Sequence, residues 1–166
     1  MDDALRLRHR MIPYLHTMNW RASRTGLPLV EPMYWGSPDI DAAYHVPNEY
    51  MFGTELLAAP ITEPMDKSSR RGKADVWLPQ GDWFDFFTGR RSSPNGRRMT
   101  VWRPLDGIPV FAKAGGIVPM QPLSEGDSIN SVDNPQHLEI IVFPGADGDF
   151  TLMEDSGHYS RQITPA

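Results

Sequence analysis

The chain has 166 residues, of which 40% are hydrophobic and 22% charged, enough for one ordinary domain or two small ones with a hydrophobic core. Its formal net charge of −5 argues against a nucleic-acid role, because phosphate binding needs a basic face. The absence of cysteine excludes disulfide frameworks, cysteine zinc sites and thiol catalysis.

Residues 3–26 are predicted to form an amphipathic helix. Apolar side chains recur at three- and four-residue steps from Ala4 to Ala22, the stripe of a helix with one buried face. Gly26 is a good C-terminal stop for this helix. Because Pro13 lies inside the pattern, we expect a bend at that point.

After Gly26, recurrent prolines argue against long helices, and short apolar or alternating runs follow. The turn PQGD, residues 79–82, leads from one predicted strand back into a second, and SPNG, residues 93–96, precedes another. Short strands at this spacing predict a mainly β fold, an N-terminal helix followed by an antiparallel β-sandwich. The predicted strands are residues 56–59, 73–78, 83–87, 97–102, 108–113 and 116–120.

A polar linker, residues 122–136, precedes a C-terminal segment that reads as strand, Gly-rich turn, strand and turn. A lone hairpin is marginally stable in water. This segment is therefore expected to pair with the preceding domain, with another chain or with residues outside this sequence.

The segment PLDGIPVFAKAGGIVPM, residues 104–120, is rich in glycine but matches neither common phosphate-binding fingerprint. Gly115 and Gly116 instead indicate turns or close approaches of the backbone. The prolines would punctuate short strands. We interpret the segment as buried architecture.

Glycosidases need two carboxylates that converge on one bond. Asp82 and Asp85 form a tempting pair, but positions three apart on a strand point to opposite faces. We interpret Asp82 as a turn acid and Asp85 as an edge or capping acid.

The other clusters of acidic residues and histidines are either metal sites or ordinary solvent-exposed turns and loops. Asp147 and Asp149 flank Gly148 and leave a calcium site open as an alternative to a solvated turn, although EF-hand spacing is absent. Asp39 and Asp41 follow a proline in a predicted solvated loop. The histidines show no HExxH spacing, and we expect no metal site; they are residues 9, 16, 45, 137 and 158.

Basic and aromatic residues leave two binding alternatives open. Four arginines flanking the SSPNG turn would suit an anionic partner or a solvated hairpin tip; they are Arg90, Arg91, Arg97 and Arg98. Three tryptophans would stack on sugar rings or fill the core; they are Trp77, Trp83 and Trp102.

Five segments stand in a distinctive order: LRLRHRMIPYLHTMNWRASRTGLPLVEPMYW, EYMFGTELLAAPI, VWLPQGDWFDFFTG, PLDGIPVFAKAGGIVPM and IIVFPGADGDFTLMEDSG. Together they resemble the C-terminal portion of glycoside hydrolase family 31, which contains α-glucosidases and α-xylosidases. The resemblance implies that residues 1–26 are the last helix of a catalytic barrel and residues 27–125 a proximal β-sandwich. Residues 126–136 would be a linker, and residues 137–166 the truncated start of a distal β-domain.

The resemblance also implies that the parent is a retaining enzyme acting on α-linked glucosides or xylosides. Its two catalytic aspartates would lie upstream, so no catalytic, cofactor-binding or metal residue is carried over to this sequence. We therefore expect a C-terminal fragment that is inactive alone, needs no cofactor and supports the barrel, its partner. No nucleic-acid or membrane partner is expected, and the lack of cysteines and of a visible signal peptide favours the cytoplasm.

Two alternatives remain open at this point. The chain would be a stand-alone carbohydrate-binding sandwich, with Trp83 as a sugar contact. It would otherwise be an interaction domain that exposes the apolar face of residues 4–22 and self-associates.

Overall fold

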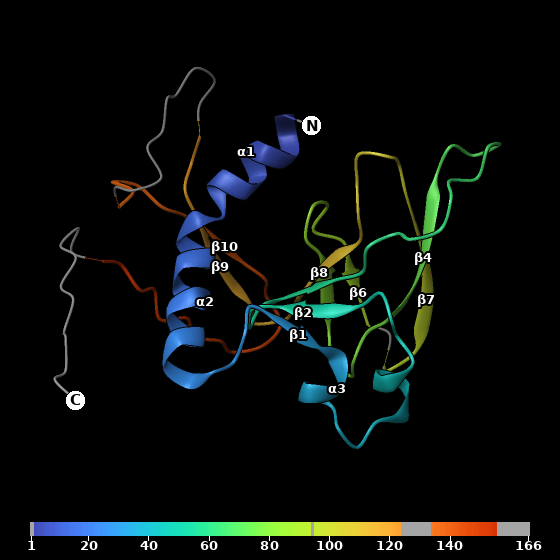
Figure 1. The fold of residues 1–166 in the computed structure, drawn as a ribbon, viewed down its shortest axis with the longest axis horizontal. Helices are drawn as coiled ribbons and strands as arrows, with labels where there is room; N and C mark the ends of the chain where they lie inside the picture. Colours follow the sequence, from blue (N-terminus) through green and yellow to red (C-terminus); the bar gives the residue numbers. More distant parts are fainter. Residues whose placement is uncertain (1, 94, 124–133, 156–166) are drawn as a thin grey trace, which may run out of the picture.

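The computed structural model describes residues 2–93, 95–123 and 134–155 of the chain (Figure 1). Its helical elements precede or interrupt the first strands; they are α1 (Asp2–Arg10), α2 (Ile12–Thr25), α3 (Met33–Gly36) and the 3-10 turn η1 (Asp41–Tyr44). None of the described helices has the length and hydropathy of a membrane-spanning segment.

The bend expected in the first helix divides it into α1 and α2. The helical pattern breaks at Met11, and Pro13 occupies the first turn of α2, where its missing N–H would have no helical partner in any case. Gly26 ends α2 with φ of 76°, and its N–H donates to the carbonyl of Ala22 at 2.9 Å. Local sequence signals therefore place both the bend and the end of this helix.

The predicted mainly β, antiparallel architecture is confirmed. A six-stranded sheet has the order β1-β2-β3-β8-β5-β6, and every described pair in it is antiparallel. Its strands are β1 (Val30–Pro32), β2 (Tyr50–Phe52), β3 (Leu56–Ala58), β8 (Val110–Lys113), β5 (Trp83–Asp85) and β6 (Arg91–Ser92). Two smaller sheets pair β4 (Gly72–Trp77) with β7 (Arg98–Arg103), and β9 (Ile117–Met120) with β10 (Glu139–Val142).

The two strands on either side of the turn at residues 79–82, β4 and β5, do not pair with each other. Strand β4 pairs with β7 over the full length of both, from Gly72 opposite Arg103 to Trp77 opposite Arg98. Strand β5 instead joins the large sheet beside β8. The turn residues show where the chain reverses, but the choice of partner depends on packing between distant segments.

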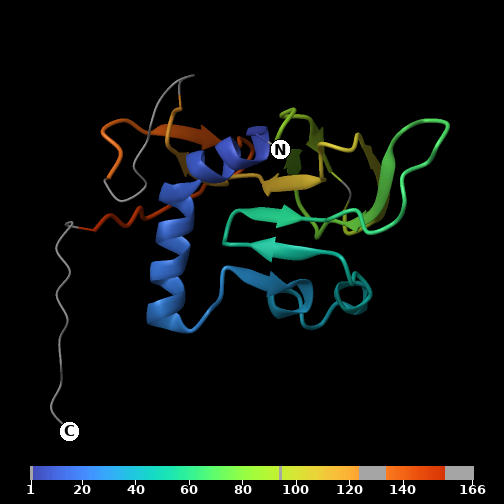
Figure 2. The ribbon, with the colours of Figure 1, turned by 45° about the horizontal axis from the view of Figure 1, so that its top comes forward.

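Side chains of the large sheet alternate between two cores, as the period of a strand requires. Leu57 and Phe111 lie opposite each other and pack with Val76 of β4 in one core. Leu56 and Ala112, one residue along each strand, pack with the helices and with β9 in the other core. The sheet is therefore a middle layer between the β4–β7 ribbon and the layer of α1, α2, β9 and β10 (Figure 2).

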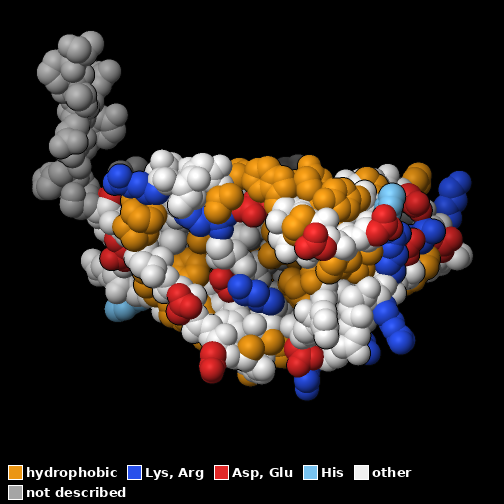
Figure 3. All heavy atoms as spheres, turned by 90° about the horizontal axis from the view of Figure 1, so that it is seen from below, with side chains coloured by type: hydrophobic (Ala, Val, Ile, Leu, Met, Phe, Trp, Pro, Cys, Tyr) orange, Lys and Arg blue, Asp and Glu red, His pale blue; other side chains and the backbone are white. Residues whose placement is uncertain are grey.

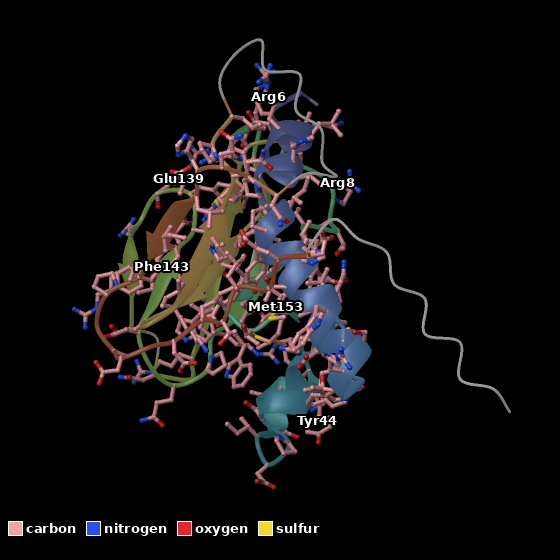
Figure 4. The ribbon with its side chains drawn as sticks, turned by 90° about the vertical axis from the view of Figure 1, so that its left-hand side faces the viewer. Arg6, Arg8, Tyr44, Glu139, Phe143 and Met153 are labelled. Carbon is pink, nitrogen blue, oxygen red and sulfur yellow. The ribbon has the colours of Figure 1, made fainter. Side chains whose placement is uncertain are left out.

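The C-terminal segment pairs with the preceding part of the chain. Strand β10 aligns antiparallel to β9, with Ile141 opposite Val118. The second strand predicted after the Gly-rich turn is wrong for residues 149–153, which have irregular backbone. These residues bind α2 instead: the Phe150 ring stacks on Tyr14 at 5.8 Å, and the N–H of Met153 donates to Thr17 Oγ1 at 3.0 Å (Figure 4).

Tyr14 joins α2 to the turn between β2 and β3. Its ring is fully buried, its hydroxyl donates to the carbonyl of Phe52 at 2.8 Å, and the N–H of Glu55 donates to the same oxygen at 3.1 Å. Burial raises the pKa of this hydroxyl well above its usual value. The hydroxyl thus binds one backbone carbonyl and one backbone N–H on the two sides of this turn.

Replacing Tyr14 with phenylalanine should lower the free energy of unfolding by about 1–3 kcal/mol, because it leaves a buried donor and a buried acceptor unpaired. Urea unfolding followed by circular dichroism measures the change. Tyr34→Phe is the matched control, since Tyr34 is 40% exposed and its loss of a hydroxyl should leave stability unchanged. Equal effects of the two substitutions would contradict the assigned role of Tyr14.

Candidate functional site

An apolar groove with a volume of about 640 Å³ opens between α1 and the large sheet. Its rim is open, since Leu105 is 89% and Phe87 52% exposed. The charged residues in its lining are Asp3, Arg8 and Asp106. The apolar lining comes from the helices (Ala4, Leu7, Met11, Leu15), from the sheet (Phe52, Leu56, Ala58, Val110) and from two loops (Phe86, Phe87, Leu105, Ile108).

The groove changes the expectation that the apolar face of residues 4–22 lies open. Met11, Tyr14 and Met18 are buried against the chain's own sheet and β9. The expectation is therefore wrong for α2, whose apolar stripe is already covered. The part of that face that lines the groove runs from Ala4 and Leu7 of α1 to Met11 and Leu15 at the start of α2.

Asp82 and Asp85 serve separate turns. Asp82 pairs with Arg91 at 2.5 Å and accepts a hydrogen bond from Ser93, and these contacts lower the pKa of its carboxyl. Asp85 is buried and caps the turn after β5, as expected from the sequence. Its Oδ1 accepts the N–H of Phe87 at 3.1 Å and both the N–H and the hydroxyl of Thr88 at 2.9 Å.

Gly115 and Gly148 bring two turns into direct backbone contact. A Cβ atom on Gly148 would lie 1.9 Å from the carbonyl oxygen of Gly115, and a Cβ on Gly115 would lie 2.5 Å from that of Asp147. This contact is the close approach predicted for the glycines of residues 104–120. The segment is architectural: β8 and β9 come from it, and its turn holds the loop before Phe150 in place.

The other sequence candidates do not gather into one site. In the part of the chain that the structure describes, no group of three or more His, Asp or Glu side chains is placed to hold a metal ion. Asp41 contacts His45 at 3.4 Å, and Arg98 donates to the carbonyl of His45 at 2.8 Å. His158 lies outside the described residues.

Two of the three candidate tryptophans belong to the core. Trp77 and Trp83 are 1% and 5% exposed, and their indole N–H groups donate to the carbonyls of Gly96 and Pro79 at 2.9 and 3.0 Å. The interpretation of Trp83 as a sugar contact is therefore wrong, because its ring is covered. Trp102, on β7, is 42% exposed.

Two buried acids have roles that the sequence analysis missed. Glu49 Oε2 accepts the N–H of Trp77 at 2.9 Å, and burial raises the pKa of this carboxyl to about 7. Glu55 Oε2 accepts the N–H of Ile117 at 3.3 Å and lies 3.8 Å from Lys113 Nζ. Both acids fasten the start or end of a strand to a distant loop, and their only local signal is a carboxylate beside an apolar run.

Comparison with known proteins gives a consistent result. The family model described as "Glycosyl hydrolase family 31 C-terminal domain" matches residues 26–118. An α-xylosidase of Saccharolobus solfataricus is 30% identical over 155 residues, which are 92% of this chain and 20% of that protein. "Alpha-glucosidase 2" of Bacillus thermoamyloliquefaciens is 29% identical over 92% of this chain and 18% of its own length.

Solved structures agree in fold. The α-xylosidase of Xanthomonas citri superimposes with a TM-score of 0.75 at 31% identity, over 92% of this chain and 16% of that one. The dextranase of Flavobacterium johnsoniae gives a TM-score of 0.74 at 30% identity, over 91% of this chain and 18% of that one. The chain thus spans about a fifth or less of the length of these relatives, which are glycoside hydrolases. On this evidence the chain belongs to glycoside hydrolase family 31 and corresponds to its C-terminal domain.

Proposed function

We propose that this chain supports the catalytic barrel of a retaining α-glycosidase and does not itself carry the reacting carboxylates. The apolar groove under α1 is the observation that supports a docking role most directly. Apolar surface of this kind, open to solvent at Leu105 and Phe87, is costly unless a partner covers it. The barrel is the partner that the family relationship offers.

The division of the chain that we propose is the one that the resemblance to family 31 implies. Residues 1–26 would belong to the barrel as its last helix, and residues 27–125 would form the proximal β-sandwich. Residues 126–136 would link it to the start of a distal β-domain, residues 137–166. Helix α1, which would belong to the barrel, forms one wall of the groove, and the sheet of the sandwich forms another. Barrel and sandwich would therefore meet at the groove.

The reaction proposed for the whole enzyme is hydrolysis of α-linked glucosides or xylosides. The names of the relatives, α-xylosidase and α-glucosidase, support this substrate class. In this chain the two acids weighed as a pair, Asp82 and Asp85, are engaged by Arg91 and Arg103. We therefore expect no hydrolysis of p-nitrophenyl α-glucoside or α-xyloside by the purified chain, and sustained turnover would overturn this expectation.

A chimera tests the docking role. The chain would replace the matching C-terminal region of the Saccharolobus solfataricus α-xylosidase, and hydrolysis of p-nitrophenyl α-xyloside would be measured together with thermal inactivation. Leu105→Glu and Phe87→Glu should lower activity and shorten the inactivation half-life, because each introduces a charge into the proposed interface. Val142→Glu, at a side chain that is 59% exposed on β10, is the matched control. An inactive chimera, or groove variants that behave like the control, would contradict the proposal.

Without a barrel, the open groove should also favour self-association of the chain. Static light scattering at increasing protein concentration measures it. Leu105→Glu should shift the distribution toward the monomer. A wild-type chain that stays monomeric at millimolar concentration would argue against this use of the groove.

A further inference from the structure

Three aromatic side chains lie exposed where α3 meets η1: Tyr34, Trp35 and Tyr44, here called the aromatic platform. They are 40%, 49% and 54% exposed. The rings of Tyr34 and Tyr44 stack with centroids 5.1 Å apart and planes only 8° from parallel. Tyr34 and Tyr44 thus each cover one ring face of the other, and solvent meets the outer faces and edges of this pair together with the exposed Trp35 indole.

The backbone beneath the platform is anchored. Met33 of α3 is 3% exposed and Ala43 of η1 is 2% exposed, and both belong to the core between the large sheet and β4–β7. The Tyr44 hydroxyl donates to the carbonyl of Pro38 at 3.0 Å, which fixes its ring. A ligand would therefore meet preformed rings and would pay little ordering entropy.

The chemistry around the platform suits a pyranose better than a purely apolar partner. Within the described residues, the Tyr34 hydroxyl and the Trp35 indole N–H make no hydrogen bond to protein and are free to bind hydroxyl groups. The exposed carboxylates of Asp39 and Asp41 follow α3 in the chain and can accept hydrogen bonds from hydroxyls. Rigid aromatic faces with polar edges match a ring that has an apolar C–H face and a rim of hydroxyls.

The other tryptophans do not offer this combination. Trp77 and Trp83 are buried, and Trp20, although 40% exposed, has the Arg24 guanidinium over one ring face at 5.6 Å from the centroid. Trp102 is exposed but stands on β7, whereas Trp35 directly follows Tyr34 on α3, beside the Tyr34–Tyr44 pair.

The platform is also separate from the groove. Tyr44 lies at the opposite end of the molecule from Arg6 and Arg8 of α1 (Figure 4). The face that carries α3 and η1, seen from below in Figure 3, shows patches of hydrophobic side chains beside acidic ones. A ligand on this face would leave the α1 groove accessible.

We infer that the aromatic platform is an accessory carbohydrate-binding surface that stacks on pyranose units of an oligosaccharide. The choice of an α-glucan as the ligand rests on the proposed function of the whole enzyme. The stacking itself rests on the exposure of Tyr34, Trp35 and Tyr44 and on the fixed Tyr34–Tyr44 pair. Its role would be to hold a glucan chain near the enzyme, away from the reacting bond.

Titration of the full chain with isomaltotriose, followed by calorimetry and tryptophan fluorescence, tests the inference. We expect saturable binding in the millimolar range. Trp35→Ala and Tyr44→Ala should each raise Kd about tenfold, the loss expected for a stacking contact of about 1.4 kcal/mol. Trp102→Ala, which removes an equally exposed indole on β7, should leave Kd within about twofold.

Two results would overturn the inference: no binding by the wild-type chain at tens of millimolar sugar, or equal losses in Trp35→Ala and Trp102→Ala. Circular dichroism and thermal unfolding of each variant show whether a loss of binding reflects unfolding, and the two independent platform variants guard against that case. The measurement needs no barrel and no catalysis. A chain that binds sugar but fails in the chimera would refute the support role alone, and the reverse result would refute the platform alone.

Discussion

Replacing Asp85 with alanine is expected to lower the free energy of unfolding by about 3–5 kcal/mol, the cost of removing one member of a buried ion pair. The Asp85 carboxylate is 5% exposed and pairs with Arg103, whose side chain is only 21% exposed. It also accepts hydrogen bonds from the backbone of Phe87 and Thr88. Alanine would leave these donors and the guanidinium without their partner in a poorly hydrated site.

Chemical denaturation followed by circular dichroism measures this change, with two variants for comparison. Asp85→Asn retains an oxygen acceptor for the turn but loses the charge facing Arg103, so an intermediate loss is expected. Asp75→Ala is the matched control, because that acid lies on the exposed side of β4 and accepts one described hydrogen bond, from Thr100 at 2.6 Å. A loss of less than about 1 kcal/mol in Asp85→Ala, the range of exposed ion pairs, would show that the carboxylate contributes little.

Asp85 also shows how far local sequence reasoning reaches. Strand periodicity separates it from Asp82, and turn chemistry predicts the cap, because both depend on neighbours within a few residues. The same holds for the break near Pro13 and for the end of α2 at Gly26. Features that depend only on residues close together in the chain can thus be predicted from the sequence.

Contacts between segments that are far apart in the chain cannot be predicted in the same way. The pairing of β4 with β7 follows from the match of two six-residue strands and their shared core, not from the turn after β4. Residues 149–153 alternate like a strand but bind α2, because the hydroxyl of Thr17 and the ring of Tyr14 offer partners there. Periodicity identifies a side chain as buried or exposed without saying what covers it.

The candidate sites show the same difference between what the sequence predicts and what depends on the whole fold. The resemblance to family 31 is confirmed over most of the chain, and it directs attention to the surface that a barrel would cover. It does not locate the groove, whose walls come from α1, the sheet and the loop at Leu105. Nor does composition distinguish Trp35 from Trp83, since exposure of an indole depends on the whole fold.

Replacing Glu49 with glutamine should remove a pH dependence of stability. Glu49 is 6% exposed, and burial, which disfavours the charged carboxylate, raises its pKa in the folded protein from the usual 4.5 to about 7. The folded protein therefore holds this proton more tightly than the unfolded chain does. The resulting stabilisation is fully present below about pH 4.5 and is lost as the pH rises through about 7.

The expected loss between pH 4.5 and pH 8 is about 3 kcal/mol, because the two pKa values, 4.5 and about 7, differ by about 2.5 units at about 1.36 kcal/mol each. Urea unfolding of the wild type and of Glu49→Gln at several pH values measures it. The glutamine oxygen can still accept the N–H of Trp77, so the variant should equal or exceed the wild type at pH 8 and lose that advantage near pH 5. Glu63→Gln is the control, because that carboxylate is 62% exposed and pairs with Lys73 at the surface.

Parallel pH profiles for the wild type and Glu49→Gln would mean that the carboxylate is hydrated or relaxes when it ionises. Diverging profiles would instead assign the instability at high pH to one residue in the loop before β2. That loop is joined to β4 by the hydrogen bond from the Trp77 N–H to Glu49, and η1 precedes the loop in the chain.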